Sequence, residues 1–249
     1  MSESDQSRAG TPRRADQLAT THWSIVIAAG HRSSPESGRA LGTLCETYWY
    51  PAYVYIRRRG FSVDEADDLT QAFFACVLEK NYIRQADREK GKFRAFFLTA
   101  LGHFLSKERD KAKAQKRGGG VRPLPLDFQT AQGRYSLEPA QGLTPDQAFE
   151  RTWAMTVLEN ALKDLRTWYV ERGKSDQFDR LKVYLEGKGS DNYSQAADEL
   201  GLSEAAVKQE VHRLRKRCKD CIRKEIGHTV ATPKEIDEEI RRLFLVFSR

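Results

Sequence analysis

The segment YSQAADELGLSEAAVKQEVHRLRKR, residues 193–217, has the pattern of two helices joined by a tight turn. Gly201 can adopt the left-handed conformation that ends the first helix, and Ser203 is a suitable N-cap for the second. Apolar residues in the second helix recur at steps of four, three and four, which predicts one buried stripe. This stripe consists of Val207, Val211, Leu214 and Cys218. The segment therefore predicts a helix-turn-helix, a motif whose second helix can enter the major groove of duplex DNA.

The second helix carries polar and mostly basic side chains outside the buried stripe. Those in its first half are placed to reach base edges, and the later ones suit the phosphate backbone, where charge gives affinity without sequence information. The predicted DNA contacts are Ser203, Glu204, Lys208, Gln209, His212, Arg213, Arg215 and Lys216. The segment alone leaves a second interpretation open, a basic amphipathic helix that packs in a bundle and keeps its charges in solvent.

The charge of the chain also favours a polyanionic partner. Its 249 residues carry a formal net charge of +7, and the sequence pI is about 9.2. The basic residues are concentrated, because residues 107–117 contain six basic and two acidic residues, and residues 208–224 contain eight and two. Two separate basic helices predict two contacts along one nucleic acid.

Several classes of protein are not indicated. No apolar run approaches the roughly 20 residues that span a bilayer, and no secretory leader is expected. Four cysteines without a framework of spacings indicate a reducing cytoplasm, and Cys218 and Cys221 are expected to be buried thiols rather than zinc ligands. No nucleophile–base pair or phosphate loop is found, so we expect no enzymatic activity, no metal and no cofactor.

Helical periodicity divides the chain into five parts, and no strand alternation of useful length occurs, so the fold is expected to be all-α. Residues 1–20 are polar and expected to be disordered. Residues 21–117 form a first helical domain, 118–143 a flexible linker rich in Gly and Pro, and 144–228 a second helical domain with the helix-turn-helix. Residues 229–249 form a C-terminal extension helix, which either folds back on the second domain or contacts a regulator. Capping boxes begin at Ser62, Thr144 and Thr232.

Two further stretches carry a family resemblance together with the helix-turn-helix. They are SVDEADDLTQAFFACVLEK, residues 62–80, and GKFRAFFLTALGHFLSKERDKAKAQKR, residues 91–117. In order and spacing the three stretches resemble extracytoplasmic-function sigma factors of the sigma-70 family, the promoter-recognition subunits of bacterial RNA polymerase. The first is similar to the region 2.2 helix that docks on the polymerase clamp, and the second to regions 2.3 and 2.4, which open and read the −10 element. The helix-turn-helix is similar to region 4.2, which reads the −35 element.

The resemblance implies partners and a role for three groups of residues. Core RNA polymerase and promoter DNA would be the partners, with docking on polymerase by Asp67, Asp68 and Gln71. The −10 element would be contacted by Lys92, Arg94, Thr99, His103, Lys107, Arg109, Lys111 and Lys113. Some sigma factors of this kind are linked to Ser/Thr kinases. A kinase or an anti-sigma factor is therefore a further expected partner, and Thr70 is a candidate site of phosphorylation, which would add negative charge to the docking helix.

The phenylalanines of residues 91–117 have the spacing of a core stripe. Phe93, Phe96 and Phe104 are predicted to pack inside, whereas at Phe97 stacking on an unpaired base stays open. Three features depart from the family pattern: the acidic Glu210 in the second helix of the helix-turn-helix, the long linker and the C-terminal extension. The alternative function is a stand-alone helix-turn-helix regulator, which would bind a palindromic operator unaided.

Overall fold

The structure, a computed structural model, describes residues 35–79, 93–114, 135, 142–185, 193–227, 230 and 232–247. Every regular element in this part of the chain is helical, so the all-α prediction is confirmed there. The predicted tail, residues 1–20, and most of the predicted linker, residues 118–143, lie outside the described residues. The long helices are α2 (Pro35–Arg58), α3 (Val63–Glu79), α4 (Phe93–Ala114), α6 (Pro145–Val170), α9 (Glu204–Gly227) and α10 (Pro233–Val246). The short ones are α7 (Ser175–Leu181), η3 (Lys182–Tyr184) and α8 (Tyr193–Leu200).

Local signals set the starts of these helices as predicted. The Thr144 hydroxyl accepts from the backbone of Gln147, whose side chain accepts in return from the Thr144 backbone, and Thr232 makes the same capping box with Glu235. The predicted box at Ser62 also forms, because its backbone amide donates to the Glu65 carboxylate at 2.8 Å. Each box satisfies amides that the first helical turn leaves without partners.

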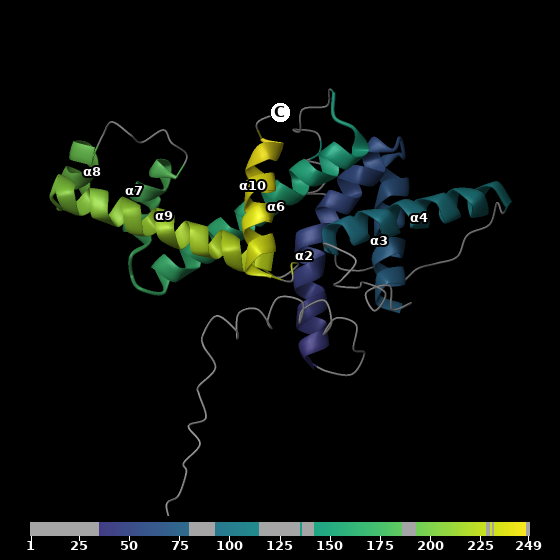
Figure 1. Cartoon of the computed structure of the whole chain (residues 1–249), viewed down its shortest axis with the longest axis horizontal. Helices are drawn as coiled ribbons and strands as arrows, with labels where there is room; N and C mark the ends of the chain where they lie inside the picture. The colour runs from purple at the N-terminus through teal and green to yellow at the C-terminus, as the bar shows by residue number, and fades with distance from the viewer. Residues whose placement is uncertain are drawn as a thin grey trace, which may run out of the picture.

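Two hydrophobic clusters form the interior of the described part of the chain. The first is built from α2, α3, α4, the first half of α6, the end of α9 and α10. The second lies between the second half of α6, α7, η3, α8 and the first half of α9. Because α6 and α9 contribute to both clusters, these two helices connect them. Figure 1 shows α8 and α7 at one end of the long axis, α3 and α4 at the other, and α10 between.

Residues on the two sides of the predicted linker share the first cluster. Helix α6 is capped by Thr144, the first residue of the predicted second domain, yet its first half packs against α2 and α4. The Phe149 ring lies 6.1 Å from that of Phe97 on α4 and 6.4 Å from that of Tyr55 on α2, measured between centroids. The core that contains the start of α6 therefore continues into the predicted first domain.

Helix α10 corresponds to the predicted C-terminal extension. Of the two predicted alternatives, folding back on the second domain or contacting a regulator, the structure shows the helix folded back. It packs on α6 and α9, with Ile236 and Leu243 buried in the first cluster. Part of its apolar side stays outside, since Phe244 and Leu245 are more than half exposed. The folded-back position explains how a helix beyond the helix-turn-helix is held without a partner chain.

Candidate nucleic-acid interface

Helices α8 and α9 form the predicted helix-turn-helix. Gly201 has φ +62°, the left-handed conformation that a residue with a side chain adopts with strain. The amide of Leu202 donates to the carbonyl of Ala197 at 2.9 Å, which closes the end of α8. Ser203 then caps α9, because its hydroxyl accepts from the amide of Ala206 at 3.2 Å. The turn is therefore fixed by local geometry at both helix ends.

The apolar stripe of α9 points inward, and its polar side faces solvent. Val207, Val211 and Leu214 are buried in the second cluster, while Cys218 is partly buried at its border. The opposite side exposes Lys208, Gln209, His212, Arg213, Arg215, Lys216 and Lys219. Ser203 and Glu204 are also exposed, at the start of the helix. All eight residues predicted to contact DNA here are thus open to a ligand.

Three of these cations already contact another group of the protein, and a DNA contact by any of them competes with that partner. The Arg213 guanidinium lies 2.6 Å from the Glu210 carboxylate, and its side chain is 67% exposed. Arg215 donates to the carbonyl of Tyr184 at 3.0 Å. Lys208 lies 3.9 Å from Glu204, at the limit of an ion pair, and its side chain is 59% exposed. Glu210 therefore holds Arg213, and a base contact by Arg213 requires that pair to open.

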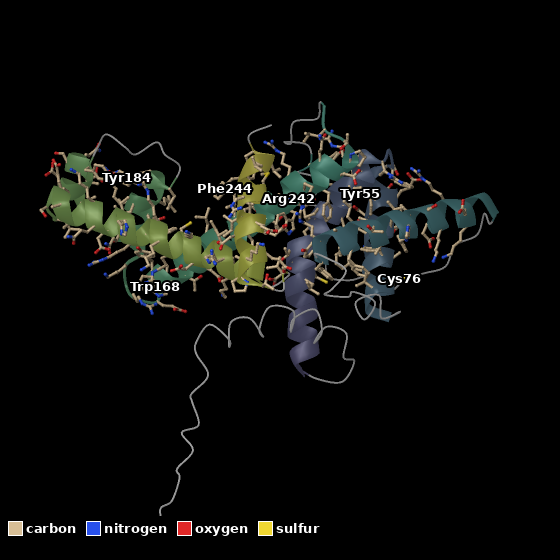
Figure 2. The ribbon with its side chains drawn as sticks, in the orientation of Figure 1. Tyr55, Cys76, Trp168, Tyr184, Arg242 and Phe244 are labelled. Atoms are coloured by element: carbon tan, nitrogen blue, oxygen red, sulfur yellow. The ribbon has the colours of Figure 1, made fainter. Side chains whose placement is uncertain are left out.

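An aromatic ring whose role the sequence did not reveal, that of Trp168, lies against the basic helix. The guanidinium of Arg217 lies 3.4 Å from the centroid of the Trp168 ring, and that of Arg172 lies 4.0 Å from it. Trp168 belongs to the end of α6 and lies beside α9 (Figure 2). Cation–π stacking holds both guanidinium groups in place while leaving them partly open to solvent. Arg172 lies one helical turn after Trp168 and could have been predicted, but Arg217 is distant in sequence.

The second predicted DNA surface lies on α4, and most of its described members are exposed. Thr99, His103, Lys107, Arg109 and Lys111 are all on the outside of the helix. Arg109 donates to the carbonyl of Arg59 at 3.2 Å and stacks over the Phe61 ring at 4.9 Å. The Glu108 carboxylate, 2.6 Å from the Lys111 ammonium, raises the pKa of that lysine. The side chains of Lys92 and Lys113 lie outside the described part of the structure.

Arg94 corrects the sequence prediction, because it does not belong to this exposed surface. Only 4% of its side chain is exposed. The guanidinium is paired with Glu150 and lies 2.9 Å from the carboxylate of Glu239, and it stacks on the Trp153 ring at 4.4 Å. A cation enclosed by two carboxylates and an indole cannot reach DNA in this structure.

The start of α3 forms an acidic surface where the docking residues were predicted. Asp68 is exposed, and Asp67 and Gln71 are partly exposed. Burial raises the pKa of Asp67, and repulsion from the carboxylates of Asp64 and Asp68 raises it further. A cation brought by a partner would relieve that repulsion, so the cluster suits a basic surface on another protein.

Thr70 requires a second correction. Its side chain is fully buried, and its hydroxyl donates to the carbonyl of Ala66 at 2.6 Å. A kinase needs the hydroxyl in solvent, so Thr70 is not accessible to phosphorylation in this structure. Thr70 follows Ala66 by four residues and precedes Phe73 by three, both buried, so its place on the inward side of α3 could have been read from helical periodicity.

Three of the four cysteines lie where burial makes their thiols less acidic. Burial raises the pKa of both Cys218 and Cys221, and that of Cys45 to about 11, which keeps the thiols protonated. Within the described ranges, no group of three or more His, Cys, Asp or Glu side chains could hold a metal ion. No helix in the same part of the chain is long and apolar enough to cross a membrane.

Comparison of the chain with protein-family models, with curated proteins and with solved structures finds no match.

Proposed function

We propose that this chain is a promoter-specificity subunit of the sigma-70 type, which binds core RNA polymerase in the cytoplasm and directs initiation without catalysing a reaction itself. The observation that carries this proposal is the exposed row of polar and basic side chains on α9, whose opposite, apolar side packs against α8 in a helix-turn-helix. In that motif the first half of the second helix lies in the major groove. Lys208, Gln209 and His212 are exposed on that half.

The exposed cations of α4 and the acidic start of α3 support the other two contacts that such a subunit makes. Lys107, Arg109 and Lys111 supply positive charge for a backbone, as single-stranded DNA binding requires. Asp67 and Asp68 lie on a different helix, which would let polymerase and DNA bind together. The proposed division places the −10 contacts before residue 118 and the −35 contacts after residue 143, with the predicted linker between.

The decisive experiment is reconstitution with core polymerase and a library of promoter sequences. The proposal expects initiation at a defined subset of the library when the chain is present, and weak binding of free DNA by the chain alone. A stand-alone regulator would instead bind a palindromic site with high affinity and leave the core polymerase unable to select a promoter. That result would establish the alternative function.

Replacing Lys208 or Gln209 by alanine is expected to reduce discrimination within the upstream promoter element. Each bidentate base contact accounts for about 1–3 kcal/mol of discrimination against the wrong base. Lys219, exposed later on α9, is the matched control. Lys219→Gln should weaken binding to all sequences equally and lower the slope of log K against log salt by about 1. Competition between promoter variants in the library measures both effects, and unchanged preferences in both alanine variants would contradict the assignment of α9.

Neutralising Asp67 and Asp68 together by asparagine is expected to weaken the complex with core polymerase at least about 10-fold. Promoter preference in the complexes that still form should stay as in the wild type, because neither carboxylate belongs to the two predicted DNA surfaces. A matched control is Asp198→Asn, which removes an exposed carboxylate on α8. Titration of labelled protein with core polymerase gives the dissociation constants, and equal values for wild type and double variant would contradict the docking assignment.

A further inference from the structure

Arg94, Glu150 and Glu239 form a buried ion network, here called the clasp, at the place where three helices meet. Arg94 lies on α4, Glu150 on α6 and Glu239 on α10. Arg94 and Glu239 are 4% and 2% exposed, and Glu150 is 32% exposed. Charged side chains are rarely buried unless they are paired, and removing one partner of a buried pair is strongly destabilising. The clasp therefore favours one arrangement of these helices.

Further contacts extend this arrangement from α10 and α6 to α9. Asp237 on α10 is paired with Arg223 on α9. The Lys224 ammonium on α9 lies 2.6 Å from the Asp164 carboxylate on α6. Ile222 and Ile226 on α9 share the first hydrophobic cluster with Trp153 on α6 and Leu243 on α10. A continuous path of packed and paired side chains thus joins α4 to the helix that carries the other basic surface.

The closed clasp leaves both proposed DNA surfaces free. Lys107, Arg109 and Lys111 are exposed on α4, as are Gln209 and Lys216 on α9. The surfaces lie toward opposite ends of the molecule, with α10 between them (Figure 1). A contact that blocked DNA would cover one of these surfaces. The clasp instead holds the two proposed DNA surfaces in one position relative to each other.

We infer that the clasp is a positioning device that sets the spacing between the two promoter elements this chain reads. One added base pair turns the second element by about 34° and moves it by about 3.4 Å relative to the first. A reader whose two surfaces are held by a buried network cannot follow that movement without breaking contacts in its interior. The inference rests on the proposed function, and it names Arg94, Glu150 and Glu239 as determinants of spacer length rather than of base preference.

The test uses promoters with identical upstream and downstream elements and spacers that differ by single base pairs. With wild-type protein and core polymerase, initiation is expected to fall about 10-fold for one base pair on either side of the best spacer, the effect of one mismatched base pair. The variant Glu150→Gln/Glu239→Gln leaves the Arg94 guanidinium buried without a counter-charge, which favours opening. Its loss per base pair should shrink to about threefold, with the preferred bases unchanged. Arg241→Gln, on the exposed side of α10, is the control and should keep the wild-type profile.

A lower folded fraction alone would reduce initiation equally at every spacer length, so the shape of the profile separates positioning from stability. Glu150→Gln alone keeps the buried Glu239 pair and should give a smaller broadening if the double variant does not fold. Identical profiles for wild type and variants would overturn the inference. A uniform rise in initiation would also overturn it, because the clasp would then be an inhibitory closure.

A measurement on the free protein separates this inference from the proposed function. Spin labels on genetically encoded ketone side chains at Lys111 and Gln209 avoid the four native cysteines. The wild type should give one narrow distance distribution and the double variant a distribution at least about twice as wide, as expected when a packed element loses its single arrangement. Equal widths would overturn the clasp even if promoter recognition is established. Failure of the wild type to direct initiation, with the widths as expected, would overturn the proposed function and the spacing role that rests on it, and would leave only the finding that the clasp holds α4 and α9 in one arrangement.

Discussion

Replacement of Arg94 by methionine is expected to lower the free energy of unfolding by about 3–5 kcal/mol. The change removes the guanidinium that lies 2.9 Å from the Glu239 carboxylate, and that carboxylate is only 2% exposed. A buried carboxylate that loses its cation keeps the cost of desolvation and no longer has the attraction that offset it. The stacking of Arg94 on Trp153 is lost as well. Urea denaturation at neutral pH, extrapolated linearly to water, gives the difference.

Arg151→Met is the matched control for this measurement. Arg151 follows Glu150 on α6, is partly exposed and stacks over the Phe247 ring at 5.7 Å. Its loss is expected to cost less than about 1 kcal/mol, as for other partly exposed cations. The double variant Arg94→Met/Glu239→Leu should recover most of the stability, because an apolar pair can replace a buried ion pair at little cost. Equal losses at Arg94 and Arg151 would show that the clasp contributes nothing of its own.

Features that depend on neighbours along the chain could be predicted from the sequence. The capping boxes at Thr144 and Thr232 follow from residues three positions apart, and both form in the structure. The left-handed Gly201 and the buried Val207 and Leu214 are equally local. Each is fixed by backbone geometry within a few residues, so a pattern in the sequence is sufficient to locate it.

Arg94 shows where local patterns stop being informative. It lies between aromatic residues at the start of a helix that becomes basic, a context that favours an exposed DNA contact. Its two carboxylate partners are 56 and 145 residues further along the chain. Nothing in the local sequence specifies those pairings, which arise only when α6 and α10 pack beside α4. Thr70 differs, because the helical periodicity of α3 is enough to place it on the buried side.

The first cluster, which α6 shares with α2 and α4, arises like the clasp from packing between segments that are distant in the sequence. The apolar residues of α6 extend along the whole helix, so the sequence predicts a buried helix but does not say what covers each part. In the structure Phe149 and Trp153 belong to the first cluster, whereas Leu165 and Tyr169 belong to the second. Which cluster a residue of α6 joins depends on which distant helices pack against that end of α6. The candidate DNA residues on α9 were easier to locate, since exposure follows directly from the stripe opposite them.

Phe97→Ala is expected to cost about 3–5 kcal/mol of stability, the usual range for deleting a buried phenylalanine ring. The side chain is 4% exposed. Its ring centroid lies 4.7 Å from that of Tyr48 and 5.2 Å from that of Phe73, and it also contacts Phe149 across the two sides of the predicted linker. The ring therefore joins α2, α3, α4 and α6, and its removal leaves a cavity in the middle of the aromatic cluster.

Phe96, its neighbour on the outer side of the cluster, provides the comparison. Phe96 is only partly buried, so Phe96→Ala should cost roughly 1–2 kcal/mol. If Phe97 instead served as a stacking surface for an unpaired base, Phe97→Ala would impair the opening of promoter DNA and leave the urea midpoint unchanged. Because Phe97 is buried, the structure predicts the opposite result. Phe97→Ala should shift the urea midpoint strongly and reduce promoter opening only in proportion to the unfolded fraction. Measuring the urea midpoint and promoter opening on the same preparation separates a core phenylalanine from a base-stacking one. Only the loss of a core residue lowers promoter opening through the loss of folded protein.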